Sequence, residues 1–377
     1  MSERIYLDNN ATTPIDPDVL DAMIGELAAP PHNPSSVHFF GQEGKKILTG
    51  CRNTIGISLN IKPSEIFFTS GGTEGMNLLI RGTLSDPSSH IIASPIDHAS
   101  VFNTLEELRE KGADITYLPI DFYGAPKAKD LQEAIQPNTR LIVLSAANSE
   151  TGIKLEMEAI AAVAKRANIP LILDGVALLG KEPFFIPEGV AAMAFSAHKF
   201  HGPQGVGFVF VRSGLKLVPL LTGGGQEKKL RSGTENLPGI VGMTHALTIF
   251  DEDEDCAYMR SLREQFEVRL IEEIPDLEVN GEGPRLPNTS NLYFPGIDAE
   301  SLLISLDMEK IAVSYASACA SGALEPSRTL LSMGYSKERV FSSLRFSFSR
   351  MNTPEEIQKT TEVIIILVQK LRNASLT

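Results

Sequence analysis

The chain has 377 residues, which is more than one hydrophobic core normally serves, so we expect two domains or one large domain with an appendage. Its net charge of −13 argues against a nucleic-acid-binding protein, because contact with phosphates needs a basic surface. The three cysteines, Cys51, Cys256 and Cys319, are far apart and odd in number. This spacing predicts neither a disulfide framework nor a metal site.

The apolar runs of the chain carry no targeting or membrane signal. Residues 1–8 contain no apolar signal core. The most apolar late run, residues 363–368, is much too short to span a membrane. We therefore expect a cytoplasmic protein with no membrane partner.

The first 255 residues alternate between short apolar runs and helical patterns. The expected strands of this part are 65–70, 90–94, 114–119, 141–145, 170–174, 191–195 and 207–211. Continuous apolar strands separated by helices predict an α/β fold, with a mostly parallel sheet flanked by helices.

The pattern changes near residue 250, after which strands and helices no longer alternate regularly. We expect a large ligand-binding domain over residues 15–255. Residues 1–14 and 256–377 are expected to form a smaller α+β domain, which would carry Cys319.

Polar residues follow the ends of several expected strands. They are Thr73, His98, Asn148, Asp174 and Lys199. The carboxyl ends of parallel strands share one edge of a sheet, and ligands bind beyond that edge. We therefore expect these five side chains to converge on a functional site.

Three of these features match the needs of pyridoxal phosphate. The glycines of residues 70–73 let a helix start approach a phosphate, although a plain tight turn has the same residues. Asp174 could pair with a protonated ring nitrogen, although a helix N-cap or an ion pair would also explain it. Lys199 precedes a Gly-Pro break and could bind the cofactor aldehyde, although surface loops often carry such a lysine. The combination is more specific than any one of them.

With further motifs, the chain resembles the cysteine desulfurases of the NifS/IscS type, within the fold-type I, class V aminotransferase superfamily. The resemblance extends over nearly the whole chain. The motifs are at residues 6–14, 33–36, 69–74 (TSGGTE), 97–98, 196–199 (SAHK), 223–227, 231–236 (RSGTEN), 317–319 (SAC) and 345–347. It implies pyridoxal phosphate as cofactor and L-cysteine as substrate.

The resemblance also implies roles for single residues. Lys199 would hold the cofactor, and Asp174 would pair with its ring nitrogen. His98 would stack on the ring and move protons, whereas an isolated Asp-His pair is more typical of a helix cap. Asn148 would approach the ring 3-oxygen and the substrate, and Arg345 would bind the substrate carboxylate, for which a planar guanidinium is suited.

The cofactor phosphate is expected to have its own set of ligands. They are Gly72, Thr73, Ser196 and His198. Thr234 would reach the phosphate of the neighbouring subunit, so the resemblance implies a homodimer.

Cys319 is expected to be the sulfur-accepting nucleophile. It lies among small residues, a composition that suits a mobile loop, whereas Cys51 and Cys256 fit inert buried thiols. The resemblance implies that Cys319 takes sulfur from L-cysteine, releases L-alanine and passes a persulfide to an acceptor such as an iron–sulfur scaffold protein.

The chain departs from the family pattern at several positions. Ala177 replaces the usual glutamine that donates to the ring 3-oxygen, and Ser149, His32 and Arg328 also differ from the common residues. His201 receives no role. The alternatives are a selenocysteine lyase, another class V enzyme acting on a different amino acid, and a non-catalytic scaffold.

Overall fold

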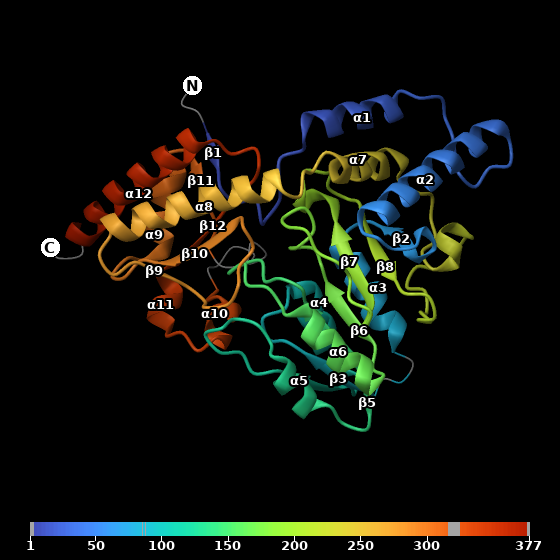
Figure 1. The fold of residues 1–377 in the computed structure, drawn as a ribbon, viewed down its shortest axis with the longest axis horizontal. Coiled ribbons are helices and arrows are strands. Elements are labelled where there is room, and N and C mark those ends of the chain that lie inside the picture. Colours follow the sequence, from blue (N-terminus) through green and yellow to red (C-terminus); the bar gives the residue numbers. More distant parts are fainter. Residues whose placement is uncertain (1–3, 85, 87, 316–324, 375–377) are drawn as a thin grey trace.

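A seven-stranded sheet forms the centre of the larger part of the molecule (Figure 1). The computed structural model describes residues 4–84, 86, 88–315 and 325–374. In chain order the strands are β2 (Ile66–Thr69), β3 (His90–Ala93), β4 (Asp114–Tyr117), β5 (Thr139–Ser145), β6 (Leu171–Asp174), β7 (Val190–Ser196) and β8 (Gly207–Val211).

The spatial order of this sheet is β2-β8-β7-β6-β5-β3-β4. Strands β7, β6, β5, β3 and β4 pair in parallel, and β8 runs antiparallel to both β7 and β2. The expected mostly parallel sheet is confirmed. Residues in each β-strand point alternately to opposite faces, and in β6 Leu171 and Leu173 join one hydrophobic cluster while Ile172 joins another.

Helices cover both faces of this sheet. They are α1 (Pro17–Leu27), α2 (Phe39–Ser58), α3 (Gly72–Thr83), α4 (Ala99–Glu110), α5 (Ala128–Ala134), α6 (Met157–Ala167) and α7 (Leu237–Thr248). Helices α3 and α4 share a cluster with Ile172, and α2, α6 and α7 share the opposite cluster with Leu173. Burial on both faces explains why the strands read as continuous apolar runs.

The smaller part has two sheets of its own (Figure 1). Its elements are β1 (Ile5–Tyr6), α8 (Glu254–Glu273), β9 (Glu278–Val279), β10 (Thr289–Tyr293), α9 (Ala299–Met308), β11 (Ile311–Ala312), α10 (Arg328–Ser332), α11 (Lys337–Phe341), β12 (Ser343–Ser347) and α12 (Pro354–Ala374). Strand β1 pairs in parallel with β11, and β10 lies antiparallel between β12 and β9.

A separate hydrophobic cluster, centred on Phe266, Phe294 and Phe346, fills the smaller part. Helix α8 carries the chain into it, and the expected boundary at 255/256 falls in the first turn of this helix. The domain boundaries stay predictions. Among the described residues, no helix has the length and apolar character needed to cross a bilayer.

Helix α7 is an element that the sequence pattern did not reveal. Asn236 caps it by accepting a hydrogen bond from the Gly239 backbone N–H at 3.2 Å. Most of its residues are buried, against α1 on one side and α2 on another, so it shows no polar face. Helical periodicity is read from the contrast between an apolar and a polar face, and here that contrast is missing.

Gly207 allows strand β8 to lie close to the turn that precedes α3. A Cβ atom at this position would lie 2.3 Å from the Phe195 carbonyl oxygen and 2.8 Å from the Gly71 Cα atom. Both neighbours are backbone atoms, which cannot move away as the tip of a side chain can.

We predict that Gly207→Ala lowers the free energy of unfolding by about 1–3 kcal/mol, because the added methyl group overpacks this junction. Gly50→Ala is the control, since Gly50 lies in α2 with nothing within 4 Å of an added Cβ, and alanine there should stabilise the helix by about 0.5–1 kcal/mol. Urea unfolding of both variants measures the difference. Equal midpoints for Gly207→Ala and the wild type would show that the junction relaxes without cost.

Candidate active site

A cavity of about 600 Å³ opens where the carboxyl ends of β5, β6 and β7 meet the smaller part. Ser145, Asp174 and Ser196, the last residues of these three strands, line it. Further lining comes from residues 9–11, the first turns of α3 and α4, the turn after β5, and residues 325–328. The cavity therefore lies at the edge of the sheet where the sequence placed the functional site.

Lys199 ends a short 3-10 helix (Ala197–Lys199) that directly follows β7. Its amine donates hydrogen bonds to the backbone oxygens of Asn10, at 2.5 Å, and Ala11, at 2.8 Å. The same N-terminal loop makes a third hydrogen bond to this segment, from the Thr13 backbone N–H to the His198 carbonyl oxygen at 2.8 Å. The N-terminal loop thus holds the lysine in the wall of the cavity.

Asp174 is a buried carboxylate at the end of β6, with 6% of its surface exposed. Burial raises its pKa, while the charges of His98 and Lys199 and a hydrogen bond from the Val176 N–H lower it. A protonated ring nitrogen would supply the hydrogen bond and positive charge that stabilise its ionised form.

A second buried acid, Asp97, lies close to Asp174. Burial, with the charge of Asp174, raises the pKa of Asp97 to about 7, against the hydrogen bonds from Ser94 and Ser145. Two carboxylates in one buried region repel each other. This part of the cavity therefore favours a cationic group.

The start of α3 forms a cradle for an anion. Gly71 has φ +147°, and a Cβ on Gly72 would lie 2.6 Å from the Val176 Cγ2 atom, so the backbone here needs glycine. Thr73, Ser196 and His198 line the same cavity, and the Ser196 Oγ atom would lie 3.3 Å from a Cβ on Gly71. A helix N-terminus with free N–H groups and nearby hydroxyls suits a phosphate ester.

The charges around this cradle also suit a phosphate. Burial, with the charge of Lys199, lowers the pKa of His198 to about 4, so its imidazole is neutral near pH 7. The Glu74 carboxylate in the first turn of α3 is engaged by Arg231, with 2.8 Å between the Arg231 Nε and Glu74 Oε1 atoms. Together with Asp174 and Lys199, the cradle fits the polar groups of pyridoxal phosphate.

His98 and Asn148 line the cavity as expected, and both side chains are hydrogen-bonded. His98 is the N-cap of α4, where its Nδ1 atom accepts from the Ser100 N–H at 3.1 Å. Asn148 accepts from the Glu150 and Thr151 N–H groups and donates to the Ile96 carbonyl oxygen. His98 therefore caps α4 and lines the cavity at the same time.

Two of the expected site residues that the structure describes, Arg345 and Thr234, do not line this cavity. Arg345 is 2% exposed on β12 and pairs with Asp8 at 2.5 Å, while its Nη1 donates to the oxygen of the cavity residue Ser149. Thr234 is exposed on the loop before α7, and Cys319 lies outside the described residues. The roles of Arg345, Thr234 and Cys319 stay predictions.

The structure adds Glu150 and Arg328 to the site. The Glu150 carboxylate accepts from the hydroxyls of Ser327, at 2.5 Å, and Thr329, at 2.9 Å, and so joins the start of α10 to the larger part. The Arg328 guanidinium donates to the Asp97 carbonyl and lies 3.6 Å from the centre of the Phe102 ring. Arg328 was visible in the sequence only as a departure from the family pattern, and nothing local distinguished Glu150.

Lys181 is a further cavity residue that sequence reasoning did not identify. It is 1% exposed, and burial lowers its pKa to about 7. It stands in a Gly-Lys-Glu stretch that reads as an ordinary exposed turn, so the sequence offered no signal.

The chain is similar to known proteins over nearly its full length. The family model for class-V aminotransferases matches residues 5–360. The chain is 38% identical to the cysteine desulfurase IscS of Dictyoglomus turgidum, over 100% of this chain and 97% of that protein. It is 40% identical to the putative cysteine desulfurase IscS 1 of Bacillus subtilis, over 98% of this chain and 100% of that protein.

Solved structures share its fold. A NifS-like protein superposes with a TM-score of 0.91 at 34% identity, over 98% of this chain and 100% of that chain. A NifS-like protein from Rickettsia africae gives 0.88 at 30% identity, over 97% and 100% of the two chains. The match thus includes both parts of the molecule and the cavity between them. The chain belongs to the class-V aminotransferase family.

Proposed function

We propose that this protein is a pyridoxal phosphate-dependent cysteine desulfurase, which converts L-cysteine into L-alanine and retains the sulfur as a persulfide on Cys319. The convergence of Lys199, Asp174 and the start of α3 on one cavity carries this proposal. The relatives named as cysteine desulfurases support the choice of substrate, because the identity extends over their whole length.

The cavity offers one contact for each polar end of the cofactor. The N–H groups at the start of α3, with Thr73, Ser196 and His198, would hold the phosphate. Asp174 would hold the ring nitrogen and the amine of Lys199 the aldehyde carbon. When bound, pyridoxal phosphate withdraws the negative charge that develops on the substrate as its bonds break.

Two residues of the cavity wall would move protons. The amine of Lys199, once the substrate amine has replaced it, would accept the proton from the substrate α-carbon, since a neutral amine is a competent base. His98 would serve as the second proton carrier, and its Nδ1 contacts with Ser100 hold the ring in place.

Cys319 would carry the sulfur step. Its thiolate sulfur bonds to the substrate sulfur, and the Cβ–S bond of the substrate breaks. The electron pair of that bond stays on the carbon, which takes up a proton to become the methyl group of alanine. The persulfide sulfur then passes to an acceptor protein, such as an iron–sulfur scaffold in the cytoplasm.

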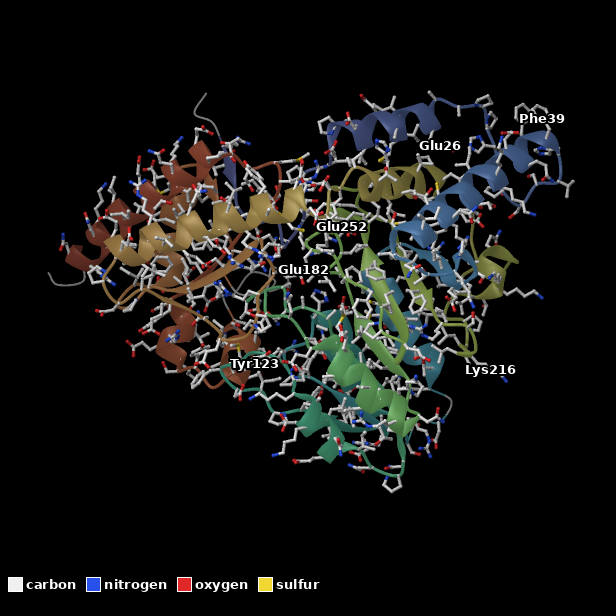
Figure 2. The ribbon with its side chains drawn as sticks, in the orientation of Figure 1. Glu26, Phe39, Tyr123, Glu182, Lys216 and Glu252 are labelled. Atoms are coloured by element: carbon white, nitrogen blue, oxygen red, sulfur yellow. The ribbon has the colours of Figure 1, made fainter. Side chains whose placement is uncertain are left out.

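A homodimer would complete the site through Thr234. The loop of Thr234 lies beside the start of α2, because Gln226 accepts from the Gly233 N–H at 3.3 Å and donates to Ser35 at 3.4 Å. Phe39, at the tip of α2 (Figure 2), is 67% exposed. An exposed aromatic residue next to the loop supports the assignment of this face to a second copy of the chain.

We predict that Lys199→Ala abolishes covalent cofactor attachment, because the variant lacks the amine that bonds to the aldehyde. The wild type should be yellow, and borohydride reduction should add a phosphopyridoxyl mass to Lys199. Lys216→Ala, which changes an exposed lysine (Figure 2), is the control and should keep the colour. A wild type that stays colourless after incubation with pyridoxal phosphate would contradict the cofactor assignment.

We predict that Cys319→Ser keeps the yellow colour but releases sulfide and alanine from L-cysteine at least about 100-fold more slowly, because a hydroxyl cannot accept the sulfur. Cys51→Ala, at a buried cysteine that does not line the cavity, should keep the wild-type rate. Parallel assays with L-selenocysteine test the alternative substrate. Full activity of Cys319→Ser with L-cysteine would exclude the persulfide role.

A further inference from the structure

Lys181 lies in the wall of the cavity and has no role in the proposed reaction. We propose that Lys181 is a further cofactor-binding residue, whose side-chain nitrogen donates a hydrogen bond to the anionic 3-oxygen of pyridoxal phosphate. The inference rests on the proposed function, since it concerns the same cavity.

Hydrogen bonds to its backbone hold Lys181 in place. Its N–H donates to the Leu178 oxygen at 3.1 Å, and its carbonyl accepts from the Cys256 thiol, in the first turn of α8, at 2.9 Å. Glu182, the next residue, lies at the junction between the larger and smaller parts (Figure 2). The backbone is thus fixed between the two parts, and the side chain reaches the cavity, whose wall it helps to form.

The Lys181 side chain is buried and has no polar partner in the described part of the chain. With 1% of the residue exposed, its side-chain nitrogen makes no hydrogen bond or ion pair with any residue that the structure describes. The nearest acid in sequence, Glu182, pairs instead with Lys154 at 2.8 Å. A buried cation without a partner is costly, and an anionic oxygen in the cavity would offset that cost.

The charges around Lys181 also favour an anion. Burial, with the charges of Lys199 and Arg350, lowers its pKa to about 7, against an opposing effect of Cys256. Burial raises the pKa of the Cys256 thiol to about 12, so this thiol remains neutral near pH 7. Lys199 and Arg350 thus add positive charge near Lys181, which an anionic ligand would balance.

Among the polar groups of the cofactor, the 3-oxygen is the one that suits Lys181. The phosphate suits the start of α3, and the ring N–H needs an acceptor, which Asp174 provides and a lysine does not. The 3-oxygen lies on the ring carbon next to the one that bears the aldehyde, and thus close to the amine of Lys199. Lys181 interacts electrostatically with Lys199, and Ala177, one turn before it in the cavity wall, has no donor.

The test compares pyridoxal phosphate with its 3-O-methyl derivative, in which the anionic oxygen is blocked. Both are titrated into the cofactor-free full-length chain, and dissociation constants are read from the absorbance change. The wild type should prefer pyridoxal phosphate, and Lys181→Met should weaken binding of pyridoxal phosphate about tenfold or more while changing that of the derivative little. Lys154→Met, the control, should keep the wild-type preference.

Adding Ala177→Gln to Lys181→Met should restore part of the preference, because it places an amide donor four residues before Lys181 in the cavity wall. If Lys181→Met does not fold, Lys181→Gln takes its place and should show a weakened preference.

An unchanged preference in the Lys181 variants would overturn the proposal. If the preference is unchanged and the loaded variant also binds L-alanine more weakly, Lys181 would be assigned to the substrate carboxylate instead. Failure of the wild type itself to bind pyridoxal phosphate would instead overturn the proposed function.

Discussion

The contact between the N-terminal loop and Lys199 is the constraint on which the site depends. The lysine amine donates hydrogen bonds to the backbone oxygens of Asn10 and Ala11. The Asn10 N–H donates to the Ser347 hydroxyl of β12 at 2.9 Å. One loop therefore connects the end of β7 in the larger part to the sheet of the smaller part. A change in the packing of the two parts would move the lysine relative to Asp174.

The electrostatics of the cavity are arranged in zones that match a ligand with both signs of charge. Two acids line one part of the cavity, Asp174 at the end of β6 and Asp97 between β3 and α4, and burial raises the pKa of both. Lys199 and Lys181 provide positive charge. The start of α3 adds free N–H groups, which carry only a partial positive charge. Such a division orients a zwitterionic cofactor in a single way, since a reversed orientation would place like charges together.

The rim of the cavity is stabilised by a stack of two aromatic rings with an arginine at each end. Arg328 lies over Phe102, Phe102 stacks on Tyr117 with 5.5 Å between ring centres, and Arg109 lies 5.2 Å from the centre of Tyr117. This stack, with the bonds of Glu150 to α10, fixes the position of residues 325–328 against α4. The segment that follows the expected nucleophile is thus tied to the helix that His98 caps.

The sequence by itself determined the seven strands of the large sheet, their mostly parallel pairing and eight residues of the cavity wall, because these follow from local apolar runs and strand-end motifs. The tertiary structure alone decided the helical state of α7, the pairing of Arg345 with Asp8 and the burial of Lys181. Each of these depends on residues far away in the chain: α7 is buried by α1 and α2, Asp8 is 337 residues from Arg345, and Lys181 is covered by the start of α8. A local pattern carries no record of such contacts, since the same residues in another fold would be exposed.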